Sequence, residues 1–244
     1  MILPHYSPSS LNLFAASPAL FVVEKCLGIR QPVGAPAHRG SAVEAGVSAG
    51  LFEPDRPVED CVQIAMARYD GLMALSGDPR REAYGADIPA MVASALEELR
   101  PYGVPTGAQG KVVWQPEGLK APIIGYFDFV WEQHGILVDL KTTTRLPQEI
   151  KLPHARQISF YLGATSDNAD GRCSYVTPKK RATYRLENVR QHRDALHRIA
   201  LACERFLALS DDPQDFIAVT CPDLDSFYWN NPIARQLAWE QWRI

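Results

Sequence analysis

Apolar residues recur every three or four positions through most of the first 107 residues, which is the spacing of amphipathic helices. Serines between Ser7 and Ser10 precede the first apolar stretch and suit the caps of a helix, and Pro18 interrupts that stretch. Residues 37–51 are rich in Ala, Gly and Ser, so we expect a helix that packs closely against its neighbours. Further helices are expected at 57–75 and 88–99.

Beyond residue 110 the pattern changes to short runs dense in Val, Ile, Phe and Trp, which are typical of strands. Expected strands lie at 111–115, 122–131, 135–142 and 172–177, and expected helices at about 153–165, at about 186–209 and after Pro232. This order predicts one α/β domain over residues 1–244. Its parts are a helical N-terminal part at about 1–107, a sheet-containing core at about 108–209 and a C-terminal helical segment at about 210–244.

Composition supports a large folded domain, because 46% of the 244 residues are hydrophobic and 22% are charged. The five cysteines are scattered and show no CxxC or zinc-finger spacing, which predicts reduced thiols and a cytoplasmic location. The first residues do not follow the pattern of a signal peptide, and no stretch approaches the length of a membrane helix, so no membrane association is expected.

The net charge of −3 argues mildly against a nucleic-acid partner, but the charge is unevenly distributed. Residues 141–198 hold 12 Lys and Arg against 5 Asp and Glu. This segment begins directly after Asp139, which permits a basic face beside an acidic pocket. A solvated helix surface would give similar counts, so the charge alone leaves both interpretations open.

The most informative pattern is a hairpin that carries two aspartates in otherwise apolar strands. If the hairpin closes symmetrically about Gln133 and His134, Asp128 lies directly opposite Asp139. Opposed residues have Cβ atoms about 5 Å apart, and two like charges there repel unless a cation lies between them. Oxygen ligands of this kind suit Mg²⁺, so the pair predicts a metal site that Mn²⁺ also occupies.

Lys141 follows two residues after Asp139 and therefore lies on the same face of the strand. An ammonium group beside a metal-bound water helps to orient that water and stabilises charge that develops on a phosphate. Asp128, Asp139 and Lys141 together predict a site for hydrolysis. The alternative is an exposed hairpin whose charged side chains have no catalytic role. The apolar residues around Asp128 disfavour this alternative, because an unpaired charge among them would be costly.

The stretches Tyr126-Phe127-Asp128 and Asp139-Leu140-Lys141 resemble the PD-(D/E)XK nuclease signature, although the first lacks its proline. Gln157 and Tyr161 match the QxxxY element of RecB-like members. Two further segments are similar to N-terminal helix motifs of that branch and of phage-type exonucleases. They are the serine-rich start around Ser10 and the segment from Arg39-Gly40 to Glu44. The iron–sulfur cluster of some members is not expected, because the cysteines lack the required spacing.

The resemblance implies a restriction-endonuclease-like α/β core, a central mixed sheet flanked by helices with a helical elaboration. It also implies metal binding by Asp128, Asp139, Glu44 and the Leu140 carbonyl, with Lys141 acting on water and Gln157 and Tyr161 positioning a DNA strand. Residues expected to contact DNA are Ser10, Arg39, Arg145, Lys151, Arg156, Lys179, Lys180 and Arg181.

The function expected from this resemblance is Mg²⁺-dependent exonuclease cleavage of DNA from free ends, in recombination, repair or replication-linked end processing. The chain has no GxxxxGK[ST] motif, so a helicase or a single-strand annealing protein is an expected partner. Alternatives are a structure-specific or general endonuclease of the same fold, a catalytically silent DNA-binding protein, and a metalloenzyme that acts on another substrate.

Overall fold

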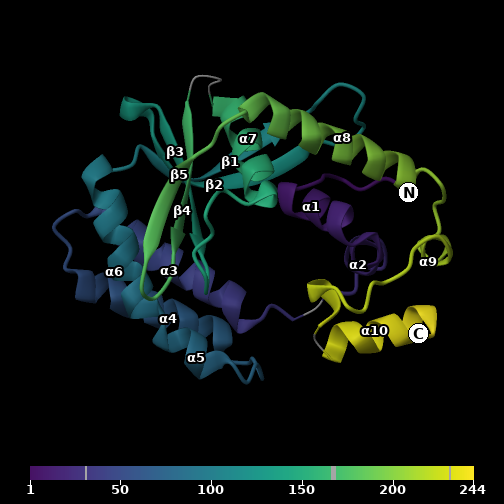
Figure 1. The fold of residues 1–244 in the computed structure, drawn as a ribbon, viewed down its shortest axis with the longest axis horizontal. Coiled ribbons are helices and arrows are strands. Elements are labelled where there is room, and N and C mark those ends of the chain that lie inside the picture. The colour runs from purple at the N-terminus through teal and green to yellow at the C-terminus, as the bar shows by residue number, and fades with distance from the viewer. Residues whose placement is uncertain (31, 166–168, 231) are drawn as a thin grey trace. The chain divides into compact units, whose positions relative to one another are not determined.

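Five strands form one sheet in the order β1-β2-β3-β4-β5 in the computed structural model, which describes residues 1–30, 32–165, 169–230 and 232–244 (Figure 1). The strands are β1 Gly107–Trp114, β2 Ile123–Trp131, β3 Ile136–Thr142, β4 Asp170–Val176 and β5 Arg181–Arg185. β2 and β3 pair antiparallel, β3 and β4 parallel, and β4 and β5 antiparallel. The sheet is therefore mixed, as predicted.

Two compact units divide the chain. The central unit comprises Val33–Val112 and Tyr126–Val189, and the terminal unit comprises Met1–Pro32, Val113–Gly125 and Arg190–Ile244. The candidate catalytic residues all belong to the central unit.

In the central unit, helices pack around the sheet because their apolar faces and the strands' apolar residues share one core. The helices are α3 Ala35–Phe52, α4 Val58–Met73, α5 Arg81–Ala86, α6 Ile88–Leu99 and α7 Leu152–Thr165, with a short 3₁₀ helix at Arg100–Tyr102. The fully buried Val43, Met91, Phe129, Trp131 and Val138 show how this core joins helices to strands. α7 connects the parallel strands β3 and β4, which a hairpin cannot join.

Helix α3 begins where a side chain from another segment caps it. The carboxylate of Asp78 accepts a hydrogen bond from the Ala35 backbone N–H at 2.9 Å, and Pro36 occupies the first turn. Near its middle, Gly46 packs against α4 so closely that an added Cβ would lie 2.5 Å from the Cys61 carbonyl oxygen. The small residues of this segment thus allow the close packing that the sequence predicts.

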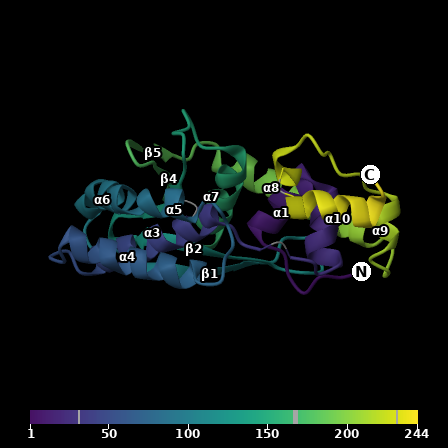
Figure 2. The same cartoon turned by 90° about the horizontal axis from the view of Figure 1, so that it is seen from below.

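The terminal unit gathers the two ends of the chain. Its helices are α1 Pro8–Ala16, α2 Pro18–Phe21, a π-helical segment Val22–Cys26, α8 Val189–Leu207, α9 Asp215–Ala218, a 3₁₀ segment Phe227–Trp229 and α10 Pro232–Trp242. A second core joins α2 to α10 (yellow in Figure 2) around Trp229, whose indole N–H donates to the Ser17 hydroxyl at 3.2 Å. The predicted break at Pro18 is confirmed.

Two elements differ from the sequence prediction. β5 occupies a segment that the apolar pattern leaves unassigned, because Arg181–Arg185 is a half-exposed strand at the sheet edge without an apolar run. α5 lies within the expected turn region between the helices of 57–75 and 88–99, where its six residues are too few for a periodic signal. Within the described ranges, no helix combines the length and apolar character that a membrane crossing requires.

The packing of α3 on α4 yields a stability prediction. Gly46→Ala forces the helices apart, so we expect a loss of about 1–3 kcal/mol in the free energy of unfolding, measured by urea denaturation. Gly71→Ala on α4 is the matched control, because an added Cβ there meets nothing within 4 Å and the change favours a helix. Equal effects of both substitutions would contradict this account.

Candidate active site

The β2–β3 hairpin places the two candidate aspartates side by side. Its register pairs Phe129 with Val138 and Trp131 with Ile136, so Asp128 and Asp139 occupy the next opposed positions. A 3₁₀ turn over Glu132–His134 closes the hairpin, as the sequence predicts. Gly135 follows it with φ 60°, a left-handed conformation that favours glycine.

Asp128 is 8% exposed and hydrogen-bonded to the neighbouring strand. Its Oδ2 accepts from the Leu140 backbone N–H at 2.7 Å. Burial and then the Asp139 carboxylate raise the pKa of Asp128 well above its ordinary value. Burial is the larger cause of this pKa shift, and the charge of the opposed Asp139 adds to it.

Asp139 is fully buried and forms an ion pair with Lys141, with 2.7 Å between Oδ2 and Nζ. Among the described residues, neither carboxylate oxygen of Asp139 accepts a well-oriented hydrogen bond, so the Lys141 ion pair is the contact that offsets its buried charge. Burial raises the pKa of Asp139, and the ammonium of Lys141 opposes that shift.

Lys141 keeps its charge in this arrangement. Burial acts to lower the pKa of Lys141, but the carboxylates of Asp139 and Asp128 outweigh burial and raise it above its usual range. In this arrangement the protonated Lys141 is a hydrogen-bond donor and a positive charge beside the two carboxylates.

Glu44 brings a third carboxylate to the same place from helix α3. Burial raises the pKa of Glu44, and the nearby Asp139 raises it further against the opposing effects of Gln109 and Lys141. Glu44, Asp128, Asp139 and Lys141 therefore interact electrostatically, although they come from a helix and two strands.

Gln157 and Tyr161 lie one turn apart on α7, and the Gln157 amide donates to the Tyr161 hydroxyl at 2.6 Å. Burial and then the Asp139 charge raise the pKa of Tyr161, so its hydroxyl is neutral near pH 7. On the same helix, burial together with the charges of Lys141 and Lys151 lowers the pKa of His154 to about 4. A neutral imidazole thus faces the Tyr175 hydroxyl at 2.7 Å.

Gln109 on β1 is the residue of this cluster that the sequence analysis does not identify. Its side-chain amide donates to Glu44 and lies 3.4 Å from Asp128 Oδ1. The sequence signal was the Gly-Ala-Gln-Gly stretch at 107–110, whose two glycines mark an irregular backbone within a strand.

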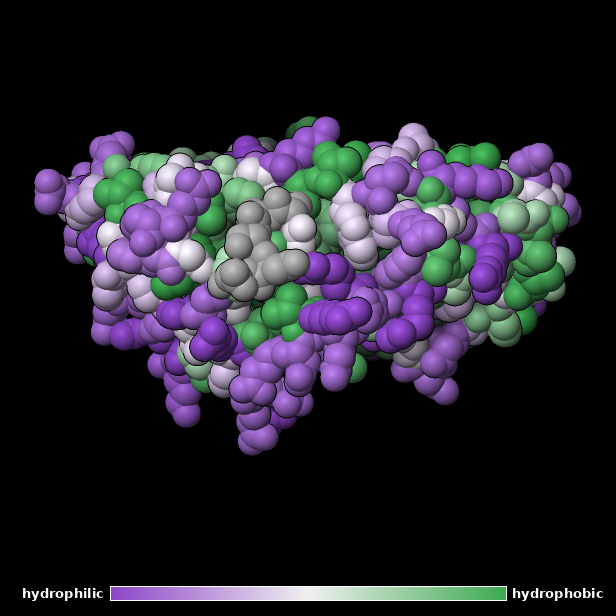
Figure 3. Space-filling model, turned by 90° about the horizontal axis from the view of Figure 1, so that it is seen from above, coloured by the Kyte–Doolittle hydropathy of each residue, from purple (hydrophilic) through white to green (hydrophobic). Residues whose placement is uncertain are grey.

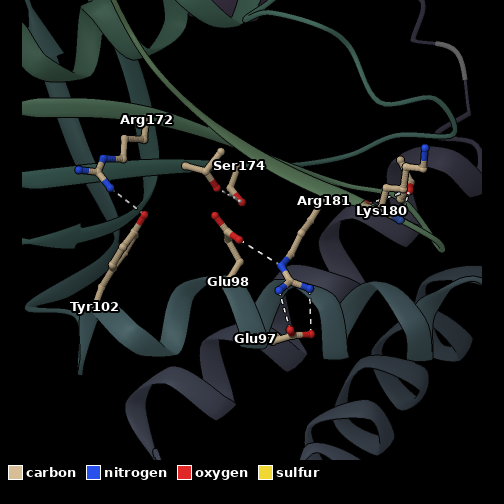
Figure 4. Close-up of polar contacts among 9 residues, drawn as sticks. Glu97, Glu98, Tyr102, Arg172, Ser174, Lys180 and Arg181 are labelled. Atoms are coloured by element: carbon tan, nitrogen blue, oxygen red, sulfur yellow. Dashed lines mark hydrogen bonds and ion pairs between the residues drawn. The ribbon is translucent and has the colours of Figure 1, made fainter.

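Arg39 and Arg181, two of the predicted DNA contacts, form ion pairs with acidic side chains of the protein. Arg39 is 2% exposed, pairs with Asp87 at 2.9 Å and stacks on Tyr84, so burial removes it from any DNA surface. Arg181 pairs with Glu97 and Glu98 of α6, and Figure 4 shows its guanidinium directed at both carboxylates.

The other predicted contacts differ in exposure and place. Ser10 belongs to the terminal unit and forms a capping box with Ser7 at the start of α1. Arg156 is half-buried on α7. The remaining four side chains are exposed: Arg145, Lys151, Lys179 and Lys180. In Figure 4 the Lys180 amine points away from the α6 glutamates.

The surface in Figure 3 is largely hydrophilic, with hydrophobic residues in small separate areas.

The oxygen atoms of this cluster are of the kind that a divalent cation requires. In the part of the chain that the structure describes, no group of three His, Cys, Asp or Glu side chains is placed to hold a metal ion. Asp139 nevertheless has two buried oxygens without well-oriented donors, and three carboxyl groups share raised pKa values. Hard oxygen ligands of this kind fit Mg²⁺ or Mn²⁺, which usually keep several water ligands.

The raised pKa of Asp128 predicts a pH-dependent stability. A carboxyl group whose pKa is raised by folding stabilises the protein below its ordinary pKa, near 4, and that stabilisation is lost as pH rises through the raised value. In EDTA, Asp128→Asn should therefore raise the Tm at pH 8 by roughly 2–4 °C, about 1 kcal/mol. The gain should shrink at pH 5.

Circular dichroism melting at the two pH values checks this expectation, with Asp225→Asn as the control at an exposed carboxylate. A lower Tm for Asp128→Asn at both pH values would refute the proposed repulsion.

Comparisons with known proteins identify the family of the chain. The family model described as the PD-(D/E)XK nuclease superfamily matches residues 5–223. No sequence among the curated proteins matches. The crystal structure of SSO0001 is similar at 17% identity and a TM-score of 0.34, covering 65% of this chain and 84% of that one, a score too low to inform on the fold. The family match spans both the hairpin carboxylates and the α7 motif, and the chain belongs to the PD-(D/E)XK nuclease superfamily.

Proposed function

We propose that the protein is a divalent-metal-dependent deoxyribonuclease that cleaves DNA from free ends. The observation that carries the proposal is the buried, opposed pair Asp128 and Asp139 with the protonated Lys141 beside it. Mutually repelling buried carboxylates destabilise a fold unless they serve a ligand, and a cation is the ligand that matches their charge.

Asp128, Asp139 and Glu44 would hold the metal together with the Leu140 carbonyl. A bound Mg²⁺ or Mn²⁺ supplies Lewis-acid stabilisation of the phosphate and lowers the pKa of a bound water. Lys141 holds its proton and donates to the attacking water or to a phosphate oxygen, where it offsets developing negative charge. Because Lys141 is held against the hairpin by Asp139, its ammonium is preorganised for this role.

Gln157 and Tyr161 are proposed to position the DNA strand. The Gln157 amide donates to the neutral Tyr161 hydroxyl, so the two side chains are held together on one face of α7. The exposed Arg145, Lys151, Lys179 and Lys180 would contact phosphates farther along the strand, with Arg156 contributing from α7. Arg39 and Arg181 are left out of this set because their charges are already paired.

The preference for ends is supported by the resemblance of the Arg39–Glu44 and Gln157–Tyr161 segments to RecB-like and phage-type exonucleases. Work in recombination, repair or replication-linked end processing would follow, beside a helicase or a single-strand annealing protein. The second candidate is a general endonuclease of the same fold, which the same carboxylate geometry would equally support.

Substitution of Lys141 distinguishes a role in DNA cleavage from a role in DNA binding. Lys141→Ala should lower single-turnover cleavage of DNA in Mg²⁺ by at least about 100-fold while changing DNA affinity little. Lys179→Ala is the matched control, because an exposed lysine should weaken binding and reduce its salt dependence while cleavage at saturation persists. Wild-type cleavage by Lys141→Ala would refute the role given to this lysine, and wild-type inactivity in both Mg²⁺ and Mn²⁺ would favour a catalytically silent protein.

The preference for ends is tested with one DNA molecule in two forms. Covalently closed circular DNA and the same molecule linearised are incubated with the protein and Mg²⁺ at equal salt, with EDTA as the metal-free arm. We expect degradation of the linear form alone. Comparable degradation of both forms would overturn the exonuclease proposal and support a general endonuclease.

A further inference from the structure

Gln109 has a backbone conformation that a side chain rarely adopts within a strand. Its φ is 51°, and among the described residues only Asn188 and Arg243 share a positive φ without being glycine. Left-handed backbone at a residue with a Cβ is unfavourable, so it persists where surrounding contacts enforce it, often at functional sites.

The side chain of Gln109 shows what this backbone conformation achieves. Its amide nitrogen donates to Glu44 Oε1 and lies 3.4 Å from Asp128 Oδ1. One exposed residue on β1 therefore reaches carboxylates on α3 and on β2 with its side-chain amide. Both partners are acceptors when ionised, so the amide NH₂ must face them.

The neighbouring residue holds this part of β1 in place. A Cβ added to Gly110 would overlap the ring of Phe127, which is adjacent to Asp128 in β2. The ring thus occupies the space that Gly110 leaves open. Packing at Gly110 and the left-handed backbone at Gln109 together direct the amide toward the two carboxylates.

We propose that Gln109 is a positioning residue of the metal site, one that orients the Glu44 and Asp128 carboxylates for the cation; this inference rests on the proposed function. A carboxylate that binds a metal through one oxygen needs its other oxygen held by a donor, and loss of such donors typically weakens metal affinity about 10–100-fold. An amide supplies the donor without adding charge, whereas a lysine at this place would compete with the metal.

The arrangement has a competing explanation with the opposite consequence. If the amide only replaces the cation between Glu44 and Asp128, the metal must displace it. Removing the amide would then tighten metal binding. The direction of the change in metal affinity therefore distinguishes positioning from competition.

The test measures Mn²⁺ binding directly, by titration calorimetry on the intact chain without DNA. Gln109→Gly removes the amide and relieves the left-handed backbone, and we expect its Kd for Mn²⁺ to rise about 10–100-fold over wild type. Asn188→Gly is the matched control: it relieves the same backbone conformation at an exposed residue and should leave the Kd unchanged.

Gln109→Glu gives a second and independent readout. It keeps the length of the side chain but replaces the donor with a third like charge near Glu44 and Asp128. We expect a lower Tm in EDTA and a larger rise of Tm on adding Mn²⁺ than in wild type, whereas Gln109→Gly should show a smaller rise.

The Mn²⁺ titrations test the proposed function and the positioning role of Gln109 separately. A wild-type chain that binds no Mn²⁺ would overturn the proposed function, and this inference with it. Normal wild-type binding with an unchanged or tighter Kd in Gln109→Gly would overturn the positioning role alone and leave the nuclease proposal intact.

Discussion

The electrostatic conflict between Asp128 and Asp139 is the constraint on which the site depends. Two carboxylates are buried opposite each other in an apolar hairpin, and within the described residues Lys141 is the cation paired with them. Neighbouring groups reduce the repulsion without removing it: the Leu140 N–H holds one oxygen of Asp128, and Gln109 approaches the other. Such a group of charges is stable because the surrounding core is rigid and already formed.

That rigidity comes from packing on both sides of the hairpin. Phe129, Trp131 and Val138 are fully buried in the core of the central unit, so the register cannot slip without exposing them. From the helical side, α3, which carries Glu44, packs closely against α4 at Gly46. The candidate site is thus built by ordinary hydrophobic packing, which keeps like charges near one another.

The parts of the site that the sequence predicts are those with a strong local signal. The hairpin register follows from two apolar strands and a short turn, and its symmetry already pairs Asp128 with Asp139. The role of Gln109 cannot be predicted from the sequence. It depends on a left-handed backbone conformation and on contacts with Glu44 and Asp128, which lie 65 and 19 residues away. Arg39 and Arg181 have basic side chains in suggestive positions, but their acidic partners come from segments distant in sequence, which no local pattern reveals.

The origin of Glu44 has a consequence for partly folded forms of the protein. Asp128 and Asp139 are brought together by one hairpin, so secondary structure alone keeps them adjacent. Glu44 joins them only while a helix is docked on the sheet. A molten form that kept its helices and strands but lost fixed side-chain packing would retain the aspartate pair and lose the third carboxylate. The three acidic groups therefore come together only where native tertiary packing is present.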